Sequence, residues 1–196
     1  MTARELIMQV LEEPRVVRHR LSVDDYERMA EVGVLAHGAR VELIEGEVIE
    51  KAPIGTRHCA AVTRLDQLLQ KALQDSALVA VQGPLRLNSY NAPEPDLAVL
   101  KPRQDFYEGT LPTGADTLLV IEVSDTTLAY DVRLKAPLYA RFGVPEYWVV
   151  DLPGGLLRIF RTPQASEWLD ISALAQPGIV ALPGLPGYSV DLTGLL

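Results

Sequence analysis

The sequence is poor in several features that define specialised classes of protein. Cys59 is the only cysteine among 196 residues, so the chain can form neither an internal disulfide nor a zinc cluster of cysteines. A lone thiol is typically a buried packing group, and we expect that role for Cys59. No apolar run reaches the roughly 18 residues needed to cross a bilayer. Internal repeats and low-complexity tracts are also missing.

The sequence has no excess of positive charge. Its 26 Asp and Glu residues outnumber its 18 Lys and Arg residues, which gives a formal net charge of −8. Proteins that bind nucleic acid usually carry a basic surface, so this total argues against a broad phosphate-binding face. A local basic groove can coexist with an acidic total, and a bound Mg²⁺ would offset part of the negative charge.

Length and apolar content fit one globular domain. Hydrophobic residues make up 48% of the chain, enough for a full core. We expect an N-terminal arm at 1–20, a single domain at 21–175, and a tail at 176–196 that packs on the same domain. The N-terminus lacks the apolar stretch and cleavage site of a signal peptide, and we expect a cytoplasmic protein without a membrane partner.

The N-terminal part of the chain predicts one helix and one hairpin. Ser22 and Asp25 form a capping box, so a helix should begin after Ser22 and run to about Glu31. The segment RVELIEGEVIEKA predicts two short strands joined by a turn at Glu45 and Gly46, where the glycine supplies the positive φ of a tight turn.

The rest of the chain predicts a mixed sheet with helices on its faces. Residues 58–73 show helical spacing of apolar positions, with Leu65 and Leu69 on one face. The run TLLVIEVSD at 117–125 is nearly all apolar, as in a central strand that is covered on both faces. Further strands are expected at 77–88, 93–101, 146–152 and 156–161, and a helix at 131–143. This order predicts an α/β (α+β) fold with a mixed central sheet flanked by helices, plus the N-terminal helix and hairpin.

A proline falls inside one of the predicted helices. Pro137 would cost about 3 kcal/mol in a helix interior, but it is tolerated in a first turn. We therefore expect the helix at 131–143 either to begin near Lys135 or to kink there.

Two carboxylates stand where a buried sheet would ordinarily exclude them. Asp96 follows a proline at one predicted strand, and Glu122 interrupts the apolar run of another. A buried charge is retained only with a partner, so the two acids predict a site for a hard cation such as Mg²⁺, with Lys135 above it on the next helix. The alternative is that both acids are strand-end groups held by backbone N–H groups or by a salt bridge to Lys135.

Three segments resemble a known protein family. They are P-E-P-D-L-A-V at 93–99, I-E-V-S-D-T-T at 121–127 and D-V-R-L-K-A-P-L-Y-A-R-F-G-V-P-E-Y-W-V-V-D at 131–151. With the hairpin V-E-L-I-E-G-E-V and the histidine that follows it, they resemble the Uma-type putative restriction endonuclease family of the PD-(D/E)XK nuclease superfamily. The resemblance covers roughly residues 21–162 and implies a restriction-endonuclease-like core.

The resemblance also implies a set of site residues. Asp96 and Glu122 would be catalytic acids that hold Mg²⁺, or Mn²⁺ as a substitute, together with the carbonyl of Val123. Ser124 occupies the position where the superfamily pattern has its lysine, and Lys135 on the next helix would replace that lysine.

Four further residues have both a functional and a structural interpretation. Glu42 matches a family glutamate and would be an auxiliary acid, or else an exposed hairpin charge. His58 would contact phosphate or a metal-bound water, or else have a structural role. Asp131 would pair with Lys135 or cap a helix, and Tyr139 would steady the site or pack in the core.

The function implied by the resemblance is Mg²⁺-dependent hydrolysis of DNA by an endonuclease, with DNA as the partner and a homodimer as a plausible assembly. One alternative is an interaction module that kept the nuclease fold and lost its activity. Another is metal-dependent hydrolysis of a small phosphoester.

Overall fold

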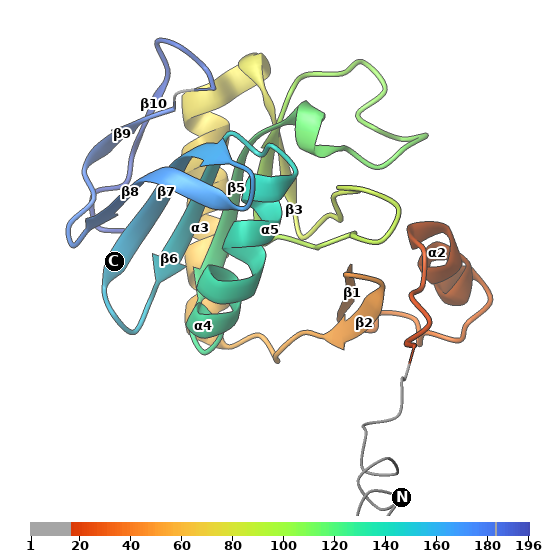
Figure 1. The fold of residues 1–196 in the computed structure, drawn as a ribbon. Coiled ribbons are helices and arrows are strands. Elements are labelled where there is room, and N and C mark those ends of the chain that lie inside the picture. The colour runs from red at the N-terminus through yellow and green to blue at the C-terminus, as the bar shows by residue number, and fades with distance from the viewer. Residues whose placement is uncertain (1–16, 183) are drawn as a thin grey trace, which may run out of the picture.

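The computed structural model describes residues 17–182 and 184–196, so most of the predicted arm at 1–20 lies outside the described residues. A six-stranded mixed sheet forms the centre of the fold (Figure 1). Its strand order is β3-β4-β5-β6-β7-β8, and every neighbouring pair is antiparallel except the parallel pair β5 and β6. The strands are β3 (Leu78–Val81), β4 (Leu97–Leu100), β5 (Thr117–Ser124), β6 (Glu146–Asp151), β7 (Leu156–Gln164) and β8 (Glu167–Leu174).

Helices cover both faces of this sheet. The long helix α3 (Thr56–Leu73) packs Leu65 and Leu69 against one face, as its apolar spacing predicts. A helical segment after β5 covers the opposite face, where Tyr139 and Ala140 join a second core cluster. This segment runs through α4 (Leu128–Tyr130), a π-helical turn (Asp131–Lys135) and α5 (Ala136–Arg141). The 3₁₀ turns are Gln74–Ser76 and Gly114–Asp116.

The central strands follow the apolar runs in the sequence, with some changes at their ends. Every residue of β6 is buried, and β5 is buried throughout except at one partly exposed position. β4 begins only at Leu97, so Asp96 lies just before the strand and not within it. β3 is much shorter than the predicted 77–88, because Gln82 turns to a φ of 50° and Pro84 cannot donate to a ladder.

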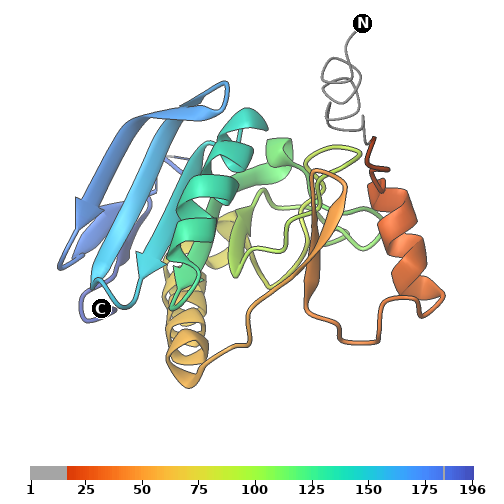
Figure 2. The same ribbon diagram turned by 60° about the horizontal axis from the view of Figure 1, so that its bottom comes forward.

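The N-terminal helix and the hairpin form as predicted. Ser22 caps α2 (Val23–Glu31) with both bonds of the capping box. The strands β1 (Val41–Ile44) and β2 (Glu47–Glu50) are joined by Glu45 and Gly46, with φ values of 54° and 78°. A Cβ on Gly46 would lie 2.6 Å from the Cβ of Arg20, so only glycine fits this turn. Figure 2 shows α2 and the hairpin at the opposite end of the molecule from β8.

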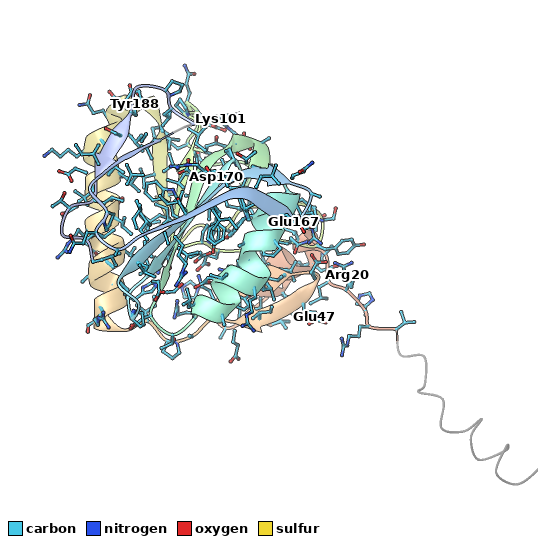
Figure 3. The ribbon with its side chains drawn as sticks, turned by 60° about the vertical axis from the view of Figure 1, so that its left-hand side comes forward. Arg20, Glu47, Lys101, Glu167, Asp170 and Tyr188 are labelled. Carbon is cyan, nitrogen blue, oxygen red and sulfur yellow. The ribbon has the colours of Figure 1, made fainter. Side chains whose placement is uncertain are left out.

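Three strands near the C-terminus were not predicted. β8 is an edge strand whose side chains are mostly exposed, so it lacks the apolar alternation that marks a half-buried strand. Charged residues on it, Glu167 and Asp170 in Figure 3, are typical of edge strands that avoid pairing with other chains. The strands β9 (Ile179–Ala181) and β10 (Ser189–Asp191) pair with each other and add Val180 and Val190 to the core beside α3.

The prediction of a buried thiol at Cys59 is wrong, because the residue is exposed. Ala61, Val62 and Leu65 turn the buried face of α3 toward the sheet, and Cys59 lies on the other face. No helix in the described part of the chain is long and apolar enough to cross a membrane.

Candidate active site

A pocket of about 370 Å³ lies where the hairpin meets the ends of β4 and β5. Its walls come from the segment that follows β2, the start of α3 and the turn after β5. The structure brings all the predicted site residues to this pocket, although they are spread over almost 100 positions of sequence. They are Glu42, His58, Asp96, Glu122, Val123 and Lys135.

Lys135 and Glu122 form a buried hydrogen-bonded pair at the base of the pocket. The Lys135 ammonium donates to Glu122 Oε1 at 2.7 Å, and the Tyr139 hydroxyl donates to the same oxygen at 3.2 Å. Both charged side chains are almost fully buried, with 2% and 5% of their surface exposed. Lys135 and Tyr139 are four residues apart, which places them on one face of the helix above Glu122.

A third charged residue completes this cluster. Glu42 Oε2 lies 3.0 Å from the Lys135 ammonium, so one cation faces two buried carboxylates. Burial is the main cause that raises the pKa of Glu122, to about 8, against the opposing charge of Lys135. Burial disfavours the charged form of Lys135, but the charges of Glu122 and Glu42 outweigh it and raise its pKa above the ordinary value. The cluster therefore keeps a protonated lysine and a proton on Glu122 near neutral pH.

Glu42 is held by protein donors at both of its oxygens. Its Oε1 accepts from the Tyr130 hydroxyl at 2.9 Å, and its Oε2 accepts from the Glu94 amide at 3.0 Å as well as facing Lys135. The residue is 1% exposed, so the interpretation of Glu42 as an exposed hairpin charge is wrong. Its oxygens are engaged in fixing Lys135 and Tyr130.

Asp96 sits in a separate set of hydrogen bonds on the other side of Glu122. Its Oδ2 accepts from the backbone amide of Val123 at 2.8 Å and lies 2.9 Å from His58 Nε2. Burial alone would raise the pKa of Asp96, but the bonds from His58 and Val123 and the charge of Lys51 hold it below the usual range. Asp96 is therefore ionised at neutral pH, in contrast to Glu122.

The helical segment that carries Lys135 widens just before Pro137. The residues Asp131–Lys135 form a π-helical turn in which the amide of Ala136 donates to the carbonyl of Asp131. Pro137 then falls in the first turn of α5, where its missing N–H costs little. Of the two expected alternatives, the α-helix α5 does begin next to Lys135, and the wider turn before it lets the segment continue while Lys135 points at Glu122.

Asp131 lines the pocket, and the sequence alone allowed two roles for it, a pair with Lys135 or a helix cap. Its Oδ2 accepts from the hydroxyls of Ser124 and Thr127, both at 2.6 Å. Burial raises the pKa of Asp131, and these two bonds oppose the rise. Ser124, at the position of the superfamily lysine, thus holds the start of the π-helical turn. The spacing of S-x-x-T-x-x-x-D was the available signal, because short hydroxyl and carboxylate side chains commonly bond across such a turn.

A divalent cation such as Mg²⁺ needs oxygen donors that face an open space. Among residues 17–182 and 184–196, no three His, Cys, Asp or Glu side chains form a ready-made metal cluster. Asp96 Oδ1 and Glu122 Oε2 accept no hydrogen bond from these residues, and neither is sealed from the pocket. Two carboxylate oxygens fit Mg²⁺, which keeps several waters and binds through one or two carboxylates.

The carbonyl of Val123 is placed to join this donor set. The N–H and C=O of one residue in a strand leave the backbone on the same side, and the Val123 N–H points to Asp96. The residues therefore fit a hydrated Mg²⁺ and not a caged transition metal.

Comparisons with known proteins agree with this fold. The chain is similar to the crystal structure of a putative nuclease belonging to DUF820 from Anabaena variabilis, with a TM-score of 0.61 and 17% sequence identity. The similarity covers 83% of this chain and 89% of that one, so the protein has a nuclease fold. A family model described as Uma2, putative restriction endonuclease, matches residues 23–193, and the chain belongs to that family. A comparison with curated proteins gave no match.

Proposed function

We propose that the protein is a Mg²⁺-dependent endonuclease that hydrolyses phosphodiester bonds of DNA in the pocket described above. The observation that carries the proposal is the meeting of two buried carboxyl groups and one buried ammonium group in one pocket. Asp96, just before β4, and Glu122, on the neighbouring β5, line the pocket, and Lys135 lies 2.7 Å from Glu122. Membership of a family of restriction-endonuclease-like proteins supports the same chemistry.

In this proposal Asp96, Glu122 and the carbonyl of Val123 hold the metal. The bound Mg²⁺ supplies a Lewis acid that polarises the phosphate and acidifies a water. Lys135 has three N–H donors, and two of them face Glu42 and Glu122, so one remains for a phosphate oxygen as negative charge grows on it. Glu42 acts as a positioning residue, because its oxygens bind the amide of Glu94 and the hydroxyl of Tyr130 as well as facing Lys135.

His58 is an auxiliary group in the same proposal. Its Nε2 orients Asp96, while its Nδ1 is buried without a hydrogen-bond partner in the described part of the chain. A buried nitrogen of this kind is costly unless a water or a ligand approaches it. We propose that a water or a substrate oxygen takes that position.

The test is cleavage of closed circular DNA, supplied as supercoiled plasmid and as a single-stranded circle, with Mg²⁺ or Mn²⁺. The parent should linearise at least one of the two circles, and Asp96→Asn should lose this activity by about 100-fold or more. Glu146→Gln is the matched control, since Glu146 is a buried carboxylate outside the pocket that pairs with Arg161. Cleavage by Asp96→Asn at the parental rate would overturn the assignment. A folded parent that cuts neither circle would favour the inactive interaction module.

The apparent affinity for Mg²⁺ should rise with pH. Glu122 must lose its proton to bind a cation, and its pKa is raised to about 8 by burial. Below that pH the proton competes with the metal, so the affinity should increase by up to tenfold per pH unit between pH 6 and 8 and then level off. Titration calorimetry at pH 6, 7 and 8 measures this slope. A flat profile would show that Glu122 is already ionised or that it does not bind the metal.

A further inference from the structure

The depth of the site restricts the substrates that can reach it. The exposed fraction is 6% for the Asp96 side chain, 5% for Glu122 and 2% for Lys135. A phosphate that contacts these groups must therefore enter the pocket, since it cannot touch them from the surface of the molecule.

The size of the pocket restricts them further. Its volume of about 370 Å³ lies near the lower end of the roughly 300–1,000 Å³ that is typical of small-molecule sites. The lining includes the segment Ala52–Gly55 after β2 and residues 125–127 after β5.

The charged side chains near the opening of the pocket do not form the two rows of cations that the two backbones of a DNA duplex would need. Lys51 is paired with Glu94 at 3.0 Å, and Arg57 faces Asp125 at 3.7 Å. Glu50 adds a further acidic group to the pocket lining. Binding of a duplex gains its affinity from rows of cations that replace counterions, but Lys51 and Arg57 already face carboxylates, and Arg40 donates to the carbonyl of Ala52.

An aromatic ring lines the same pocket. Tyr130 is half-buried, and its hydroxyl is fixed by the bond to Glu42, so the ring has a set orientation at the wall. Proteins that hold unpaired strands stack bases on such rings without regard to sequence.

We infer that the site takes the phosphodiester of an unpaired nucleotide, with the neighbouring base against Tyr130, and not the backbone of an intact duplex. This inference rests on the proposed nuclease function. A duplex becomes a substrate only where its strands separate, and strand separation costs a few kcal/mol that a single strand has no need to supply.

The test compares a single-stranded circle with a relaxed closed duplex circle of the same sequence, at equal Mg²⁺. The single-stranded circle should be cut at least about tenfold faster per phosphodiester, and a supercoiled duplex should fall between the two because supercoiling eases strand opening. Equal or faster cutting of the relaxed duplex would overturn the inference and leave the nuclease function standing. Absence of cleavage of all three would remove both.

Variants of Tyr130 test the role of the ring. Tyr130→Leu should raise the KM for the single-stranded circle by roughly fivefold or more, whereas Tyr130→Phe loses the bond to Glu42 but keeps the ring and should raise the KM less. An unchanged KM in Tyr130→Leu would show that no base stacks there. A rise of equal size in Tyr130→Phe would point to the bond with Glu42, and would also contradict stacking.

Discussion

Replacing Lys135 with methionine is expected to lower the free energy of unfolding by about 3–5 kcal/mol. The change removes the one cation that lies between Glu42 and Glu122 and leaves two carboxylates buried without their partner. Glu122 can take up a proton, but Glu42 would keep only the Glu94 amide and the Tyr130 hydroxyl as partners. Urea denaturation followed by circular dichroism measures the loss.

Lys51→Met is the control for this experiment. Lys51 lines the same pocket, but its side chain is 11% exposed and that of its partner Glu94 is 29% exposed, so water can solvate the carboxylate that the change leaves behind. The urea midpoint of Lys51→Met should therefore fall less than that of Lys135→Met. Equal midpoints for Lys135→Met and Lys51→Met would contradict the buried cluster. If Lys135→Met does not fold, the double variant Glu42→Gln with Lys135→Met should recover part of the stability.

Glu122→Gln should have the opposite effect on stability and still abolish activity. The folded pKa of Glu122 is about 8 against an ordinary value of 4.5, so the folded state holds this proton more tightly than the unfolded state does. Its contribution is fully present below pH 4.5 and is lost as the pH rises through 8. A neutral amide imitates the protonated form, so without metal Glu122→Gln should be as stable as the parent at about pH 4 and more stable than the parent at about pH 8.

The same variant should cut DNA at least about 100-fold more slowly, because an amide binds Mg²⁺ poorly and competes weakly for its hydration shell. Glu146→Gln should show the reverse pattern. Its carboxylate accepts bonds from Arg161 at 2.8 Å and from Trp148, so its loss should cost stability and leave the cleavage rate intact. A Glu122→Gln variant that is less stable than the parent at every pH would contradict the proton assigned to Glu122.

The fold was largely predictable because its central elements depend on strong local patterns. The apolar run of β5, the capping box at Ser22 and the turn at Gly46 each point to one structure, and the structure contains all three. The edge strand β8 was missed because its alternation of exposed and buried positions is weak. Its pairing with β7 comes from the backbone ladder and not from an apolar pattern that sequence reasoning can detect.

Which residues form the site was predictable, but not how they contact one another. Carboxylates at two predicted strands marked Asp96 and Glu122, with Lys135 on the next helix, and resemblance to a family added Glu42, His58 and Val123. The contact of Lys135 with Glu42 as well as Glu122 brings in the hairpin from far away in the chain, so no local pattern shows it. The π-helical turn before Pro137 likewise depends on how the helix packs over the sheet, which spacing alone does not determine.

Binding of Mn²⁺ to the parent, Asp96→Asn, Glu122→Gln and Glu146→Gln at pH 8 tests most directly whether Asp96 and Glu122 hold a cation together. Calorimetry reports the affinity of all four proteins without any need for a substrate. If Asp96 and Glu122 hold the cation together, we expect binding to the parent and to Glu146→Gln with closely similar affinity, and a loss of at least about tenfold in each of the other two. Equal binding by all four proteins, or none by a folded parent, would contradict it.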